Sequence, residues 1–128
     1  MIYPNDFINQ NILGNSIDIT PLIPDNTIDL IITSPPYDNM REYEGKIVNN
    51  VLYEDNYTFP FIEMAKEMYR ILKDGGIAVW VVGDQVQDGG ETGNSFRMAL
   101  KFQEIGFRIY DTMIYHKNGS PFPETARY

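Results

Sequence analysis

Two short apolar runs place the strongest limits on how this chain folds. Residues 28–32 read IDLII, and residues 77–82 read IAVWVV. Both runs are rich in β-branched and aromatic residues, and both are shorter than a typical buried helix. Apolar residues at nearly every position, rather than at every second one, are typical of strands buried on both faces. The two runs therefore predict neighbouring strands inside a parallel sheet.

A helix is predicted between these strands, over residues 60–73. Thr58 is expected to cap it, Pro60 suits its first turn, and Gly75-Gly76 is expected to end it. Its apolar residues recur at spacings of three and four and so share one face; they are Phe61, Met64, Ala65, Met68, Ile71 and Leu72. Strand, helix and strand in this order predict a βαβ unit.

The flanking segments complete an α/β pattern. Residues 11–22 predict a short strand, a Gly14-Asn15 turn and a weakly helical stretch, and residues 38–55 a long surface excursion. A second helix is predicted over residues 95–104, capped by Asn94 or Ser95 and ended by Gly106, followed by a strand over residues 107–116. The expected fold class is α/β, with mostly parallel strands and helices on both faces of the sheet. Ligands bind such sheets at the carboxyl ends of the strands.

Composition excludes several classes of site. A chain of 128 residues makes one small domain or a piece of a larger one. It has no cysteine and one histidine, which excludes a disulfide scaffold, a thiolate zinc site, a cysteine nucleophile and a multi-histidine metal centre. Its net charge of −8 argues against nonspecific binding to nucleic acid, which normally requires a basic face. The glycine-rich loop 83–94 lacks the spacings of phosphate-binding motifs, so we assign it no phosphate role.

Targeting signals are also missing from the sequence. The apolar runs are far shorter than a membrane span, and the first residues, MIYPNDF, lack the charged and apolar regions of a signal peptide. We therefore expect an intracellular, cytoplasmic chain.

The chemistry of the chain is concentrated in a four-residue turn, Ser34-Pro35-Pro36-Tyr37, at the end of the first strand. Two prolines fix two φ angles and remove two amide donors, so the turn is stiff and presents acceptors without competing N–H groups. The Ser34 hydroxyl and the Pro35 carbonyl suit a partner that offers only donors, such as the exocyclic amine of a nucleobase. Tyr37 supplies an aromatic face on which a base can stack. The alternative is an inert turn that ends the strand, with Tyr37 packed as an ordinary aromatic.

These residues resemble a known family. Residues 29–37, DLIITSPPY, are similar to the catalytic motif of S-adenosylmethionine-dependent DNA amino-methyltransferases of the N4-cytosine and N6-adenine class. Residues 70–76, RILKDGG, resemble the helix-to-strand joint that follows that motif, and residues 114–118, IYHKN, resemble a later motif. By composition, SPPY occurs in roughly one chain of this length in a thousand, so its position after an apolar strand argues against coincidence.

The resemblance implies a fold, a cofactor and a set of site residues. It implies a Rossmann-like methyltransferase sheet, S-adenosylmethionine as methyl donor and DNA as substrate. It implies Ser34, Pro35, Pro36 and Tyr37 as catalytic residues and Asn15 and Ser34 as cofactor-binding residues. Asn15 is equally well interpreted as a turn residue. Ser in place of Asp or Asn at the head of the motif favours N4 of cytosine over N6 of adenine.

His116 and Lys117 are better interpreted as solvent-facing residues at a strand end than as reactants. The acidic residues of the surface excursion are interpreted as a solvated face; they are Glu42, Glu44, Glu54 and Asp55.

The resemblance also points to a missing part. These enzymes hold the cofactor with a glycine-containing turn after another strand, and no such motif occurs in this sequence. Only 33 residues precede Ser34, too few for an upstream cofactor unit. We therefore expect residues 1–128 to be the catalytic-motif half of a permuted, beta-type methyltransferase, either truncated or split. A chain missing its front is the alternative. Glutamine and protein-amide methyltransferases fit less well, because they keep the glycine motif upstream.

Two further expectations follow from a missing half. The isolated chain is expected to be inactive, either as a remnant or as an assembly half that needs a separate cofactor-binding chain. It is also expected to form a homo-oligomer through the unpaired edge of the 28–32 strand, unless the N-terminal segment covers that edge.

Overall fold

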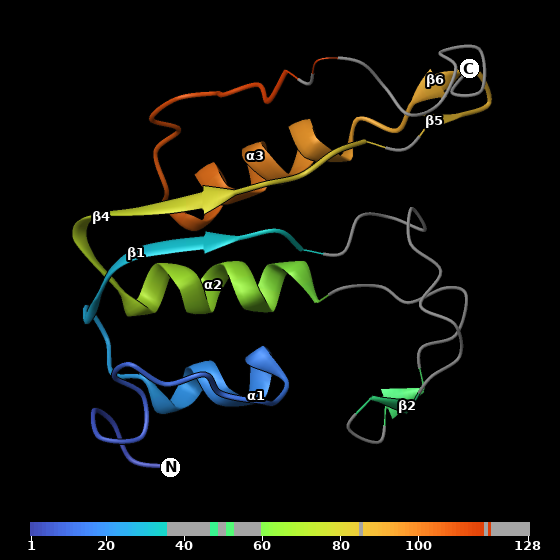
Figure 1. Cartoon of the computed structure of the whole chain (residues 1–128). Coiled ribbons are helices and arrows are strands. Elements are labelled where there is room, and N and C mark those ends of the chain that lie inside the picture. The colour runs from blue at the N-terminus through green and yellow to red at the C-terminus, as the bar shows by residue number, and fades with distance from the viewer. Residues whose placement is uncertain (36–46, 49–50, 53–59, 85, 117, 119–128) are drawn as a thin grey trace.

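The computed structural model describes residues 1–35, 47–48, 51–52, 60–84, 86–116 and 118 (Figure 1). The two principal strands and two principal helices of this part are β1 (Ile28–Thr33), α2 (Phe61–Ile71), β4 (Leu72–Trp80) and α3 (Asn94–Ile105). The smaller elements are α1 (Ser16–Ile19), the 3-10 helix η1 (Thr20–Leu22) and the two-residue strands β2 (Ile47–Val48), β3 (Val51–Leu52), β5 (Val86–Gln87) and β6 (Gly90–Glu91).

The two apolar runs form the predicted parallel pair. In the register of β1 and β4, Ile31 lies beside Ala78 and Thr33 beside Trp80. The pairing continues one step beyond both strands, because the Val81 amide donates to the Thr33 carbonyl at 2.9 Å. The parallel α/β core expected from the sequence is confirmed to this extent, since the described residues place two strands in this sheet.

The helix between the strands ends earlier than predicted. It was expected to continue to residue 73, but α2 ends at Ile71, and Leu72 already has the extended backbone that starts β4. Gly75 does not end the helix; it lies inside β4 with φ of +79°, near a register shift in the pairing with β1. Pro60 occupies the N-cap position, and Thr58 lies outside the described residues.

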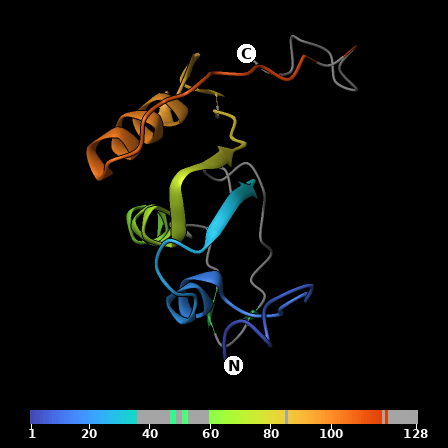
Figure 2. The same ribbon diagram turned by 90° about the vertical axis from the view of Figure 1, so that its left-hand side faces the viewer.

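The described principal helices lie on one face of the sheet (Figure 2). An aromatic cluster joins them to β4: the Trp80 ring lies 5.6 Å from Phe61 of α2 and 5.2 Å from Phe102 of α3. Phe61 and Phe102 also meet edge to face at 5.1 Å. Helices on both faces were expected; in the described part α2 and α3 share the face that bears Trp80.

The other helical prediction holds at one end. Helix α3 ends at Gly106 as predicted. Gly106 has φ of +134°, and its amide N–H donates hydrogen bonds to the carbonyls of Phe102 and Gln103. At its start the N-cap is Gly93, with φ of +73°, rather than Asn94 or Ser95. Both of those residues lie within the first turn of the helix.

Three other expectations about secondary structure are wrong. The described residues 107–116 form no strand, because nothing in the described part pairs with them, and residues 11–14 form none either. The segment 83–94 is not a plain loop. It carries the hairpin of β5 and β6, whose turn residues Asp88 and Gly89 both have positive φ, as a two-residue hairpin turn requires.

The described core is small and lies under one face of α2. It consists of Met64, Ala65, Met68, Ile71 and Leu72. The strands are not buried on both faces as predicted, because Leu30 and Ile32 of β1 are 52% and 66% exposed. Among the described helices, no stretch is long and apolar enough to cross a membrane.

Candidate active site

The sheet brings the first half of the predicted catalytic turn to the expected edge. Ser34 and Pro35 follow β1 directly, at the carboxyl ends of the parallel strands. Ser34 is exposed and Pro35 is buried, so the proline fixes the turn while the serine lies at the surface. This placement agrees with a ligand site at the strand ends. Pro36 and Tyr37 lie outside the described residues.

Asn15 has a structural task in addition to its predicted role. It is the N-cap of α1, and its Oδ1 accepts a hydrogen bond from the Ile17 amide at 3.3 Å. Asn15 therefore has the local structural role that its interpretation as a turn residue implied, at the start of α1. Helix α1, which Asn15 begins, packs against α2.

Asp84 was not predicted from the sequence as a functional residue, and it lies just beyond β4 at the same edge as Ser34. One carboxylate oxygen, Oδ1, accepts from the Ser95 amide at 2.8 Å and from the Thr92 hydroxyl at 3.4 Å. The other, Oδ2, accepts from the Ser95 hydroxyl at 2.5 Å. Asp84 thus accepts a hydrogen bond from a first-turn amide of α3 although it lies 11 residues before Ser95 in the sequence. This contact brings the two ends of the segment 84–95 together. A single acidic residue after a strand carried no sequence signal for this contact.

The hydrogen bonds decide the ionisation of Asp84. Burial alone would raise the pKa of this carboxyl, but hydrogen bonds donated by Ser95, Thr92 and the Asn94 backbone outweigh burial and hold the pKa below its ordinary value. A group with a lowered folded-state pKa stabilises the fold above its unfolded pKa, and this stabilisation is lost as the pH falls through the folded value.

We therefore expect Asp84→Asn to destabilise the chain by about 1 kcal/mol near pH 7, the usual effect of losing a helix cap. The difference from the wild type should shrink as the pH falls from the ordinary pKa of an aspartate through the lowered folded-state pKa, because the carboxyl takes up a proton over this range and loses the charge that the donors stabilise. Urea unfolding at pH 7 and pH 3 measures this. The same difference at both pH values would contradict a charged cap, and Asp88→Asn at the hairpin tip is the matched control.

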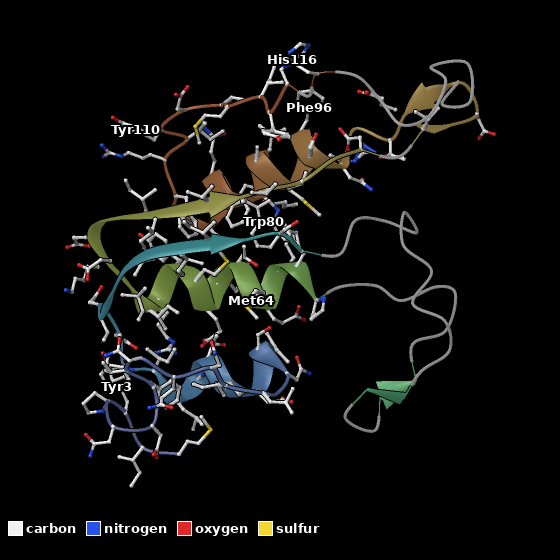
Figure 3. The ribbon with its side chains drawn as sticks, in the orientation of Figure 1. Tyr3, Met64, Trp80, Phe96, Tyr110 and His116 are labelled. Atoms are coloured by element: carbon white, nitrogen blue, oxygen red, sulfur yellow. The ribbon has the colours of Figure 1, made fainter. Side chains whose placement is uncertain are left out.

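Of the remaining residues that the sequence analysis weighed, His116 lies in the described part of the structure. His116 is exposed and lies beyond α3 in Figure 3, as its solvent-facing interpretation requires. Lys117 and the acidic residues of segment 38–55 lie outside the described residues. Among the residues that the structure does describe, no group of three His, Cys, Asp or Glu side chains could hold a metal ion.

Comparison with known proteins decides the family. The family model described as DNA methylase, of the N6/N4 type, matches residues 28–128. This match covers both β1 and β4, the Ser34 turn and α3. The chain belongs to this family of DNA methylases.

Individual relatives agree with the family model. The orphan methyltransferase M.BamHII of Bacillus amyloliquefaciens is 52% identical over 106 residues, which are 83% of this chain and 36% of M.BamHII. The type II methyltransferase M.SfiI of Streptomyces fimbriatus is 30% identical, over 82% of this chain and 29% of its own length. The type II beta methyltransferase M.BslI of Bacillus sp. (strain NEB-606) is 31% identical, over 91% of this chain and 14% of its own length.

The methylase chain therefore spans about a third or less of the length of these relatives. Methyltransferases of this family use S-adenosylmethionine. In this structure the two predicted cofactor contacts are the Asn15 side chain, whose Oδ1 already caps α1, and the exposed Ser34. That these two residues hold the cofactor stays a prediction.

Proposed function

We propose that this chain is the catalytic-motif part of a DNA methyltransferase that modifies an exocyclic base amine. The observation that carries the proposal is the position of Ser34-Pro35, directly after β1 at the carboxyl edge of a parallel pair, in a chain of the N6/N4 methylase family. S-adenosylmethionine would supply the methyl group. The relatives named above are methyltransferases, which supports this reaction class.

Each residue of the turn has a distinct role in this proposal. The lone pair of an exocyclic amine is delocalised into the base, so acceptors at the Ser34 hydroxyl and the Pro35 carbonyl help to localise it on nitrogen. Pro35 and Pro36 keep the turn rigid, so that the acceptors need no rearrangement during the reaction. The amine cannot be reached inside a duplex, and a flipped base needs the aromatic face of Tyr37.

We propose N4 of cytosine as the target, with N6 of adenine as the alternative. The proposal rests on Ser34, because the related motifs of adenine enzymes more often begin with Asp or Asn. Methylation of DNA by the reconstituted enzyme, followed by nucleoside analysis, distinguishes N4-methylcytosine from N6-methyladenine. Detection of N6-methyladenine alone would exclude the cytosine assignment.

A substitution at Tyr37 tests the stacking role. In an enzyme reconstituted with a cofactor-binding part, Tyr37→Ala is expected to lose about 1–3 kcal/mol of base interaction. Tyr37→Phe is the matched control and should keep most of the activity, because the ring remains. Single-turnover methyl transfer measures both variants. Equal rates for Ala and Phe would remove stacking from the mechanism.

A second candidate function is an assembly half or an inactive remnant. It is favoured by the short span of this chain, which matches 36% of the length of M.BamHII. Calorimetric titration of the isolated chain with S-adenosylmethionine separates the two candidates. Micromolar binding together with methyl transfer would show a self-sufficient enzyme, whereas no binding supports the assembly half.

We also expect the isolated chain to self-associate through β1. Among the described strands β1 pairs with β4 alone, so its other edge is a template for a further strand. Sedimentation at micromolar concentration is expected to show a dimer or a larger species. A monodisperse monomer of 14.8 kDa with slow amide exchange at residues 28–32 would show instead that the N-terminal segment protects this edge.

A further inference from the structure

The sequence DGG occurs twice in the described part of the chain, at residues 74–76 in β4 and at residues 88–90 in the β5–β6 hairpin. An aspartate followed by glycine is prone to rearrange its backbone, because glycine has no side chain to hinder attack by its own amide nitrogen on the preceding carboxyl. Both aspartates are exposed. The fold places these two identical sequences in different backbone environments.

Asp88 and Gly89 are the two central residues of the hairpin turn. The pair formed by Gln87 and Gly90 closes the ladder of β5 and β6, so the peptide between Asp88 and Gly89 lies outside it. The φ angle is +53° at Asp88 and +80° at Gly89, and two positive φ angles are characteristic of a type I′ turn.

This turn prepares Asp88 for ring closure with the next residue. Type I′ and type II′ turns close the same kind of hairpin and differ by a rotation of the central peptide. Both have a positive φ at the first central residue, whose ψ is about −120° in type II′. A five-membered succinimide ring between the Asp88 side chain and the Gly89 nitrogen holds ψ in that range. The hairpin thus already has the required φ, and one peptide rotation, which Gly89 permits, supplies the ψ.

The other Asp-Gly step, Asp74-Gly75, lies inside β4, and the pairing with β1 continues on both sides of it. Asp74 lacks the positive φ of Asp88. The backbone here lies close to β1, since a Cβ added at Gly76 would be 3.3 Å from the Asp29 carbonyl oxygen. Rotation of the Asp74-Gly75 peptide would disturb this pairing, so ring closure at Asp74 requires the strand to open first.

We propose that Asp88-Gly89 is a site of spontaneous covalent modification, at which Asp88 converts to isoaspartate through a succinimide. The Gly89 nitrogen attacks Cγ of the protonated carboxyl; an N–Cγ bond forms, a C–O bond breaks, and the hydroxyl leaves with the amide proton as water. Water then adds to one of the two ring carbonyls. Addition at Cγ restores aspartate, whereas addition at the main-chain carbonyl breaks its bond to nitrogen and leaves the chain running through Cγ. Nothing is oxidised or reduced.

The modification is expected to open the hairpin and to leave α3 in place. Isoaspartate lengthens the main chain by one carbon and attaches the carboxylate directly to Cα. A two-residue turn sets the register of its hairpin, so the longer turn no longer fits the pairing of β5 with β6. The start of α3 is held separately, by the hydrogen bonds from Ser95 to Asp84.

The two DGG sequences allow a test within one molecule. The full chain is aged in buffer, digested, and analysed by mass spectrometry with fragmentation that distinguishes isoaspartate from aspartate. Isoaspartate is expected to accumulate at position 88 at least about tenfold faster than at position 74, because an exposed turn rearranges more easily than a paired strand opens. In the same chain aged in urea the two positions should react at similar rates, since the fold no longer separates them.

Two variants separate the succinimide from other routes. Asp88→Glu should abolish the modification, because its side chain would have to close a six-membered ring, which forms far more slowly. Asp88→Asn should age faster than the wild type through the same ring, with ammonia as the leaving group. Equal rates at positions 74 and 88 in the folded chain, no isoaspartate at position 88, or an Asp88→Asn chain that ages no faster than the wild type would each overturn the proposal. None of these measurements depends on methyl transfer.

Discussion

Phe102→Ala is expected to destabilise the chain by about 3 kcal/mol, at the lower end of the range for removing a packed phenylalanine. Phe102 is the centre of the aromatic cluster: its ring lies 5.1 Å from Phe61, 5.2 Å from Trp80 and 5.2 Å from Phe107. These edge-to-face contacts join α2, β4, α3 and the segment after α3. The substitution therefore removes the contact shared by all four and leaves a cavity between them.

Phe96→Ala on the same helix is the matched control. The Phe96 side chain is 69% exposed, so its removal should change the free energy of unfolding by less than about 0.5 kcal/mol. Urea unfolding monitored by circular dichroism measures both variants, and fluorescence of the single tryptophan, Trp80, reports on the cluster itself. If the two alanine variants unfold at the same urea concentration, the cluster is not what holds α3 to the sheet.

Arg70→Met is expected to cost about 2 kcal/mol and to release the N-terminal segment from α2. The guanidinium donates to the carbonyls of Thr20 and Ile23, at 3.0 and 2.8 Å. It also pairs with Asp25 at 2.6 Å and with Glu67 at 2.8 Å. The hydrogen bonds that the guanidinium donates to the carboxylates of Glu67 and Asp25 raise the pKa of Arg70 above its ordinary value, so it stays charged at every pH at which the protein is folded.

The geometry explains why a lysine should not replace this arginine. A planar fork of donors reaches two carbonyls and two carboxylates at once, whereas an ammonium has three donors on one atom. Arg70→Lys should therefore recover less than half of the loss. Lys101→Met is the control, because it breaks the exposed pair with Glu104, which is worth less than about 0.5 kcal/mol.

Amide exchange gives the more specific readout for Arg70. The amides of Asn26 and Thr27 donate to the carbonyls of Arg70 and Ile71. Their exchange should accelerate in Arg70→Met, while exchange in β4 stays slow. Uniform acceleration across the chain would mean that Arg70 supports the whole fold rather than the N-terminal segment.

The elements that the sequence predicted correctly are those with a local signal. The apolar runs of β1 and β4, the spacing of apolar residues in α2 and the glycine after α3 are visible without any knowledge of distant contacts. The helix end at Ile71 was missed because Leu72 continues the helical spacing, and pairing with β1 overrides that preference. The strand expected over residues 107–116 has suitable residues, but a strand exists only beside another strand.

For side-chain roles, too, local signals could be interpreted from the sequence and long-range contacts could not. The Ser34-Pro35 turn could be proposed from the sequence because its chemistry is contained in consecutive residues. Asp84 and Arg70 were missed because their partners lie 11 and up to 50 residues away in the sequence. Contacts of this kind depend on which distant segments pack together. The identity of a single common residue, such as Asp or Arg, does not predict them.

The hydrogen bonds that Ser95 donates to the Asp84 carboxylate affect how the sequence at this edge of the protein can vary. They fix the two ends of an excursion, so the start of α3 does not depend on the residues between them. Insertions or deletions in the β5–β6 hairpin should leave the sheet and α3 in register, since lengthening a loop whose ends are fixed adds little free energy. The hairpin is thus a place where related chains can gain or lose sequence without refolding the rest, and where an engineer can graft a new loop.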